Sequence, residues 1–226
     1  MSNDLKILAL SDLHGNLIDC SKYESDVMII AGDILPLEFQ NDILESKFWM
    51  LNNFKDWLKK QHTHTVIFIG GNHDKLFQDD PDFMYSEFPK TSNYIYLQDD
   101  YVEIDRKKIY GNPWCHIFFN WSFMTTDDEL YNIYSKMPKD IDILISHDCP
   151  YGLNDVILDS KCYTGKHVGN YPLRLIIEER KPKYCISGHL HTATHNKMLL
   201  NKTKCYNVSI LNEQYNIAYE PKILYV

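Results

Sequence analysis

Short apolar runs recur along the chain, and each of them ends in a polar turn that carries Asp, His or Asn. Five such runs cover residues 6–10, 27–30, 65–69, 141–145 and 184–187. Runs of this length that are rich in β-branched residues and closed by glycine or polar residues are typical of buried strands. Ligands of layered α/β proteins gather at the carboxyl ends of strands, so these turns are where we expect the chemistry.

Two segments between the strands have helical patterns. Residues 41–61 place apolar side chains on one face and polar side chains on the other, as an amphipathic helix does. The apolar positions are Leu44, Phe48, Leu51, Trp57 and Leu58. A second helix is predicted to begin at a cap near Asn170, to carry Pro172 in its first turn and to end before Pro182. Strands that alternate with helices indicate a layered α/β fold.

Two regions interrupt this alternation. Residues 94–111 have the pattern of short antiparallel strands, and the tail from 204 to 226 has the pattern of another set. Together they predict a second, mixed sheet. No internal repeat, low-complexity tract or Pro/Gly/Ser linker divides the sequence, so we expect residues 1–226 to form a single domain.

Composition and charge narrow the class of function. The formal net charge of the 226 residues is −8, which disfavours broad electrostatic binding to nucleic acid. Arg occurs only at 106, 174 and 180, too rarely for a cluster that grips phosphate. The apolar runs are too short to cross a bilayer, and the N-terminus lacks the order of a signal peptide. The six cysteines are scattered, so we expect reduced thiols in a cytoplasmic protein without membrane contact.

The polar turns hold residue types that bind metals. They read Asp12-Leu13-His14, Gly32-Asp33, Gly71-Asn72-His73-Asp74, Ser146-His147-Asp148 and Gly188-His189-Leu190-His191. Taken singly, Asp12 and Asp33 could cap turns and His147 could lie in a surface loop. Composition alone, however, would produce G-H-x-H roughly 0.02 times and G-N-H-[D/E] roughly 0.004 times, so their occurrence together indicates a site.

These residues offer oxygen and imidazole ligands, which suit Mn²⁺, Fe or Zn²⁺. They do not provide the thiolates of a cysteine-bound zinc site. Two ions about 3.5–4 Å apart need a shared carboxylate and hold a water whose pKa falls towards about 7. The ions would also supply the positive charge that an acidic, Arg-poor protein needs to handle a phosphate.

In this order, the motifs resemble those of the calcineurin-like metallophosphoesterase superfamily across residues 8–191. The resemblance implies an α/β fold, a four-layer α/β/β/α sandwich with two mixed β-sheets and metals at the carboxyl ends of strands. It implies two divalent ions, Mn²⁺ first and Fe, Zn²⁺ or Ni²⁺ as alternatives. The implied metal ligands are Asp12, His14 and His191 for one ion, Asn72, His147 and His189 for the other, and Asp33 as the bridge. The implied catalytic residues are Asp33, Asn72 and His73, with His73 as the acid that protonates the leaving oxygen.

The surroundings of the motifs are similar to the animal-type metallophosphoesterase-domain branch, which is class III phosphodiesterase-like. The similarity lies in residues 111–114, 147–155 and 181–183, and it implies action on cyclic nucleotides or small phosphodiesters. Two departures stand out. The Asp-Arg-Gly of serine/threonine phosphatases is missing after Asp33, which counts against phosphoprotein substrates. The loop after His147 reads Asp-Cys-Pro instead of the Gly-Pro-Pro of close relatives.

We therefore expect a binuclear metal-dependent phosphoesterase that uses a metal-bound hydroxide on phosphodiester or phosphomonoester bonds of small phosphorylated substrates. A retired phosphoesterase fold that serves as a protein-binding scaffold, or a nuclease, are the alternatives. His73 could instead be a hydrogen-bond donor to a neighbour. The aromatic stretch 114–121 could stack on a nucleobase or pack in the core, and His167 and His195 could line the pocket.

Overall fold

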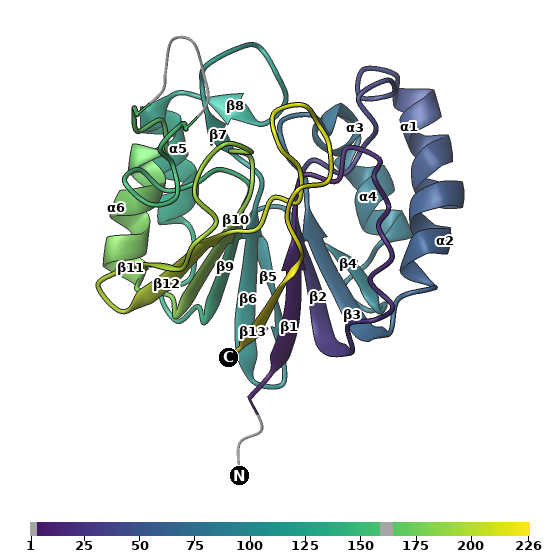
Figure 1. The fold of residues 1–226 in the computed structure, drawn as a ribbon, viewed down its shortest axis with the longest axis horizontal. Helices are drawn as coiled ribbons and strands as arrows, with labels where there is room; N and C mark the ends of the chain where they lie inside the picture. The colour runs from purple at the N-terminus through teal and green to yellow at the C-terminus, as the bar shows by residue number, and fades with distance from the viewer. Residues whose placement is uncertain (1–3, 159–164) are drawn as a thin grey trace.

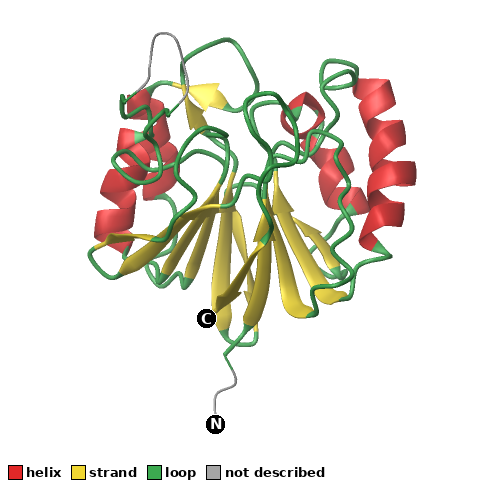
Figure 2. Cartoon of the chain, viewed as in Figure 1, coloured by secondary structure: helices red, strands yellow, loops and turns green. Residues whose placement is uncertain are grey.

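The computed structural model describes residues 4–158 and 165–226, so Cys162 lies outside the described residues. Two β-sheets pack face to face and helices cover the outer face of each sheet (Figure 1). Figure 2 shows these four layers, with the loops gathered at one edge of the sheets. This architecture confirms the predicted α/β/β/α sandwich.

The first sheet has five strands in the order β13-β1-β2-β3-β4. Their bounds are β1 (Lys6–Leu10), β2 (Ser25–Ala31), β3 (Thr63–Ile69), β4 (Tyr94–Tyr96) and β13 (Lys222–Tyr225). Strands β1 to β4 run parallel, and β13 pairs antiparallel with β1. The carboxyl ends of β1, β2 and β3 therefore meet at one edge.

The second sheet has six strands in the order β11-β12-β10-β9-β6-β5. Their bounds are β5 (Asp100–Ile104), β6 (Lys107–Asn112), β9 (Ile143–Ser146), β10 (Tyr184–Ser187), β11 (Met198–Leu200) and β12 (Thr203–Asn207). The four central strands are parallel, and β5 and β11 are antiparallel edge strands. A separate parallel pair is formed by β7 (Cys115–His116) and β8 (Met124–Thr125).

Alternation of side chains along the strands creates the layers. Ile7 and Ile29 of the first sheet pack with Ile143 and Ile186 of the second in a buried layer between the sheets. The opposite faces of the same strands pack against helices. The helices on the first sheet are α1 (Ile43–Trp49), the π-helical segment η1 (Met50–Phe54), α2 (Lys55–Leu58), α3 (Lys75–Asp79) and α4 (Pro81–Glu87). Those on the second sheet are α5 (Asp127–Ser135) and α6 (Tyr171–Arg180).

The structure corrects two local predictions. Leu44 and Phe48 were expected on the buried face of the first helix, but they are 77% and 62% exposed, and Leu51 is also exposed. The face that packs on the sheet carries Met50 and Phe54 instead. A helix turns by about 100° per residue, so the exposed set centred on Phe48 and the buried pair Met50 and Phe54 point to different sides of it. Trp57 and Leu58 are buried as predicted.

The second correction concerns the segments that interrupt the alternation. Residues 94–111 were expected to form antiparallel strands, but β4 is parallel to β3 and belongs to the first sheet, and only β5 and β6 pair antiparallel. The tail is also divided, because β12 joins the second sheet and β13 the first.

In the described part of the chain, no helix is long and apolar enough to traverse a bilayer.

Candidate metal centre

The turns after five parallel strands bring every predicted metal ligand together at the carboxyl edge of the two sheets. The first sheet contributes Asp12 and His14 after β1, Asp33 after β2 and Asn72 after β3, and the second contributes His147 after β9 and His189 and His191 after β10. All are buried except His189, which is partly exposed. Residues far apart in the sequence thus share one polar centre inside the protein.

The donor atoms fall into two groups around Asp33. Ligand atoms of Asp12, His14 and His191 lie within 4.8 Å of one another, and so do those of Asp12, Asp33 and His147. The Oδ2 atom of Asp33 is 3.4 Å from Nε2 of His14 and 3.3 Å from Nε2 of His147. This carboxylate therefore stands between His14 and His147, where a bridging ligand would lie.

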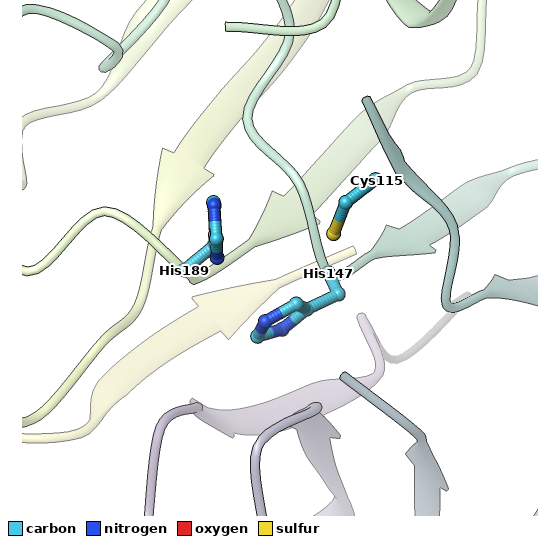
Figure 3. Close-up of side chains that lie close together, drawn as sticks. All are labelled: Cys115, His147 and His189. Carbon is cyan, nitrogen blue, oxygen red and sulfur yellow. The ribbon is translucent and has the colours of Figure 1, made fainter. Parts of the chain in front are cut away.

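Two other contacts complete the donor set. Nε2 of His191 lies 3.3 Å from Oδ1 of Asp12. Nε2 of His147 lies 3.0 Å from Oδ1 of Asn72. Figure 3 shows the His147 and His189 side chains close together, with the Cys115 thiol beside them.

Several of the proposed ligands have a left-handed backbone conformation. Asp12, His14, Asp33 and His189 have φ angles of 57°, 41°, 52° and 68°, in the left-handed region that non-glycine residues rarely adopt. Such conformations cost on the order of 1 kcal/mol each and cluster at functional sites. At Gly188, a Cβ atom would come within 2.0 Å of the Ser11 Oγ atom, so only glycine lets this turn approach β1 so closely.

Hydrogen bonds from the backbone hold the ligands in place. Nδ1 of His147 donates to the Ala31 carbonyl at 2.8 Å, and Nδ1 of His191 donates to the Asn212 carbonyl at 3.1 Å. Both rings are thereby fixed with Nε2 left for the centre. The His189 N–H donates to both oxygens of Asp12 at 3.0 Å.

Asp74 supports the turns that carry the ligands. Its carboxylate accepts hydrogen bonds from the backbone N–H groups of Ile34, Leu35 and Gly71 at 2.9 to 3.1 Å. These bonds tie the turn after β2 to the turn after β3. Burial, reinforced by the nearby Asp33 carboxylate, raises the pKa of Asp74 to about 7.

Burial and charge set the protonation of the centre in opposite directions. Burial lowers the pKa of His14 and of His189 to about 4. Burial also opposes a charge on His147, but the Asp33 and Asp12 carboxylates outweigh it and raise the pKa of that ring to about 10. The pKa of Asp33 lies well below its usual range because nearby imidazoles outweigh its burial. The carboxylates are thus ionised and surrounded by imidazoles.

The donor set fits divalent ions. Both ring nitrogens of His14 and the side-chain nitrogen of Asn72 are buried without a hydrogen-bond partner among the described residues. Buried polar atoms rarely stay unpaired, and unpaired imidazole nitrogens beside two carboxylates are what a metal site leaves open. Burial raises the pKa of the Cys115 thiol, which lies beside His147 and His189, well above its usual range.

His73, the predicted acid, lies at the edge of the centre. The backbone N–H of His73 donates to Oδ1 of Asp33 at 2.8 Å, and the centroid of its ring is 5.0 Å from that of the His14 ring. Nδ1 of His73 contacts Oε1 of Gln40, and its ring centroid lies 4.4 Å from that of Trp121. The ring lines a polar cavity of about 400 Å³ with Asn72, Gln40 and Trp121.

Sequence reasoning missed two neighbours of the centre. The ring of Tyr215 lies 4.9 Å from that of His14 and 5.3 Å from that of His191. Tyr215 and Gln40 lie in loops outside every motif, and no periodic pattern could have identified them.

Two other histidines were expected to be pocket candidates. His167 pairs with Asp155 at 2.7 Å, and His195 stacks on Tyr219 with ring centroids 3.8 Å apart. Neither ring lines the polar cavity beside His73.

Comparison with known proteins agrees with this geometry. The family profile described as calcineurin-like phosphoesterase matches residues 5–193. The human metallophosphoesterase domain-containing protein 1 is 26% identical and covers 97% of this chain and 70% of its own length. The UPF0046 protein T07D4.2 of Caenorhabditis elegans is 27% identical over 97% of this chain, which spans 59% of that relative.

A lariat debranching enzyme of Schizosaccharomyces pombe is also similar, with 27% identity over 76% of this chain and 44% of its own. Among solved structures, phosphopantetheinyl hydrolase of Mycobacterium tuberculosis superposes with a TM-score of 0.59 at 13% identity. The superposition covers 95% of this chain and 92% of that one, so the two proteins share the fold.

Proposed function

The chain belongs to the calcineurin-like phosphoesterase family, and from that premise we propose that it is a binuclear metal-dependent phosphoesterase acting on small molecules. The bonds it hydrolyses are phosphodiesters or phosphomonoesters. One observation carries the proposal: Oδ2 of Asp33 lies within 3.4 Å of imidazoles from both ligand groups. A carboxylate shared in this way is what a two-metal site requires.

Each ion has its own set of residues in this proposal. One ion is held by Asp12, His14 and His191 and the other by Asn72, His147 and His189, with Asp33 shared. When bound, the ions, Mn²⁺ first, supply an activated water and neutralise charge on the phosphoryl oxygens.

The remaining chemistry falls to His73. Gln40 contacts Nδ1 of the ring, which leaves Nε2 free to donate a proton to the leaving oxygen when the ring is charged. Trp121 packs against the same ring. Asn72 completes the catalytic set, because its Oδ1 lies 3.0 Å from Nε2 of His147 and the residue directly precedes His73.

Charge and cysteine chemistry favour a small substrate in a reducing compartment. The net charge of −8 repels a polyanionic backbone. The described cysteines, 20, 115, 149, 185 and 205, are all free and buried, which supports a cytoplasmic location. We also propose that residues 1–226 form a single domain. The similarity to a lariat debranching enzyme makes RNA the second candidate substrate.

Metal analysis and turnover test the proposal together. Purified protein loaded with Mn²⁺ is expected to contain two ions per chain and to cleave bis(4-nitrophenyl) phosphate, and chelation is expected to abolish turnover. Full activity after exhaustive chelation would overturn the metal-dependent mechanism. A metal-free, inactive protein would favour the scaffold alternative, and preference for a branched RNA over small esters would favour the nuclease.

A further inference from the structure

An apolar cavity of about 350 Å³ adjoins the metal centre. Its described lining consists of Phe118, Phe119, Ile157, Val168 and Leu190, together with the rings of His116 and His189. His189 is a proposed metal ligand, so this cavity is continuous with the place where a phosphate would bind. A cavity of this size lies in the range that small-molecule ligands occupy.

An aromatic wall separates this cavity from the polar cavity beside His73. The rings of Phe118 and Trp121 lie 5.4 Å apart, and those of Phe119 and Trp121 stack at 5.3 Å. Trp121 faces the polar cavity, whereas Phe118 and Phe119 face the apolar one. The aromatic stretch that the sequence left open therefore divides two subsites of opposite polarity.

The His116 ring stands in the wall of the apolar cavity, and its orientation is fixed by Asp148. Oδ2 of Asp148 accepts hydrogen bonds from the backbone N–H of His116 at 3.1 Å and from its Nδ1 at 2.8 Å. Asp148 is fully buried, in the loop that departs from Gly-Pro-Pro. Because Nδ1 is occupied, Nε2 is the ring atom left for a ligand.

We propose that this cavity receives an apolar ester group of the substrate, so that the enzyme prefers phosphodiesters with one alkyl or aryl arm. The inference rests on the proposed phosphoesterase function and adds a substrate class to it. His73 lines the other cavity, so the leaving alcohol lies there and the apolar arm is the one retained on phosphorus. A phosphomonoester has no second arm and leaves the apolar cavity unused.

A series of 4-nitrophenyl alkyl phosphates tests the proposal. Water adds to phosphorus, the bond to 4-nitrophenolate breaks, and the alkyl phosphate is released. The leaving group is constant from methyl through propyl to hexyl, so only the retained arm changes. We expect kcat/KM of the Mn²⁺-loaded protein to rise about two- to fourfold per buried methylene.

Two substitutions address the cavity directly. Val168→Thr keeps the shape of the side chain and adds a hydroxyl, and Phe119→Ala removes part of the wall. Each is expected to lower the hexyl-to-methyl ratio of kcat/KM by roughly three- to tenfold, since burying a polar group or losing apolar contact weakens the longer arm. Phe48→Ala, which removes an equally exposed phenylalanine on α1, is the matched control and should keep the wild-type ratio.

Binding without turnover supplies an independent readout. Hexylphosphonate is expected to bind the Mn²⁺-loaded protein at least about tenfold more tightly than methylphosphonate by titration calorimetry. Equal affinities, or a flat kcat/KM series with metal-dependent turnover intact, would overturn the apolar subsite and leave the phosphoesterase proposal standing. Absence of turnover on every ester would instead overturn the proposed function, and the phosphonate titration would still decide the subsite.

Discussion

The Oδ2 atom of Asp33 lies 3.3 Å from Nε2 of His147, and the two residues belong to different sheets. Asp33 follows β2 of the first sheet, and His147 follows β9 of the second. The proposed ligand set is divided in the same way, with four residues from the first sheet and three from the second. Two metal ions bound by this set would link the two sheets of the sandwich.

Metal binding should therefore stabilise the fold. Ions that bind the folded chain at a free concentration of 100 times Kd contribute about 2.7 kcal/mol. For a chain of this size, that corresponds to a rise in Tm of roughly 5–10 °C. Thermal unfolding of the stripped protein with and without Mn²⁺ measures it, and an unchanged Tm would contradict a site between the sheets.

Asp33→Ala should weaken metal binding and sharply lower turnover. The variant removes the oxygen that both ligand groups share, so we expect bound Mn²⁺ to fall from two ions per chain to at most one and kcat/KM to fall by more than roughly 10²-fold. Metal content by mass spectrometry and hydrolysis of bis(4-nitrophenyl) phosphate check both effects. Asp128→Ala, at an exposed carboxylate in the first turn of α5, should change neither.

His73→Asn should affect poor leaving groups most. A general acid contributes about 10²–10⁴-fold when the leaving oxygen needs a proton, and little when the leaving group is already stable as an anion. We expect kcat to fall by roughly 10²-fold or more on dialkyl phosphates and much less on 4-nitrophenyl esters. Equal losses on both would instead assign the His73 side chain a role in positioning the substrate, not in protonating the leaving oxygen.

The His116–Asp148 pair should show strong coupling in stability. His116→Ala leaves the buried Asp148 carboxylate without its partner, which should lower the free energy of unfolding by about 3 kcal/mol. The double variant His116→Ala/Asp148→Ala should recover part of that loss, because no buried charge remains. Urea unfolding measures the cycle, and His62→Ala, at an exposed ring, should cost less than about 0.5 kcal/mol. Additive losses would show that the two side chains do not depend on each other.

The described thiols should resist modification in the native protein. Burial raises the pKa of Cys20 to about 12 and those of Cys115 and Cys149 well above the usual range. The hydrogen bond with Cys205, together with burial, does the same for Cys185, so thiolate is scarce at pH 7. We expect iodoacetamide at pH 7 to leave these four unmodified until urea is added, as peptide mass spectrometry would show. Rapid labelling of any of them in the folded protein would contradict their burial.

The sequence contained enough information for the strands and the motif residues, because both depend on local patterns. Each buried strand is a short apolar run, and each proposed ligand follows one directly. The start of α6 is equally local: Asn170 caps it by accepting from the Leu173 N–H at 2.9 Å, and Lys181 ends it with a left-handed φ of 55°.

What could not be predicted depends on distant partners. Nothing in residues 94–96 says that they pair with β3 rather than with the following strand, and the choice is made by the packing of whole layers. Leu44 and Phe48 fit a helical period but lie on its outer side. Gln40 and Tyr215 reach the centre only because loops from separate strands meet there.

The isoleucines between the sheets influence the candidate metal centre although they do not contact it. Their packing sets how far one sheet stands from the other, and so it sets how far the proposed ligands of one sheet lie from those of the other. Removing a single methyl group from this layer, as in Ile143→Val, would therefore change the distances between the proposed ligands without touching any of them. The apolar layer between the sheets thus controls the geometry of the candidate site at their carboxyl edge.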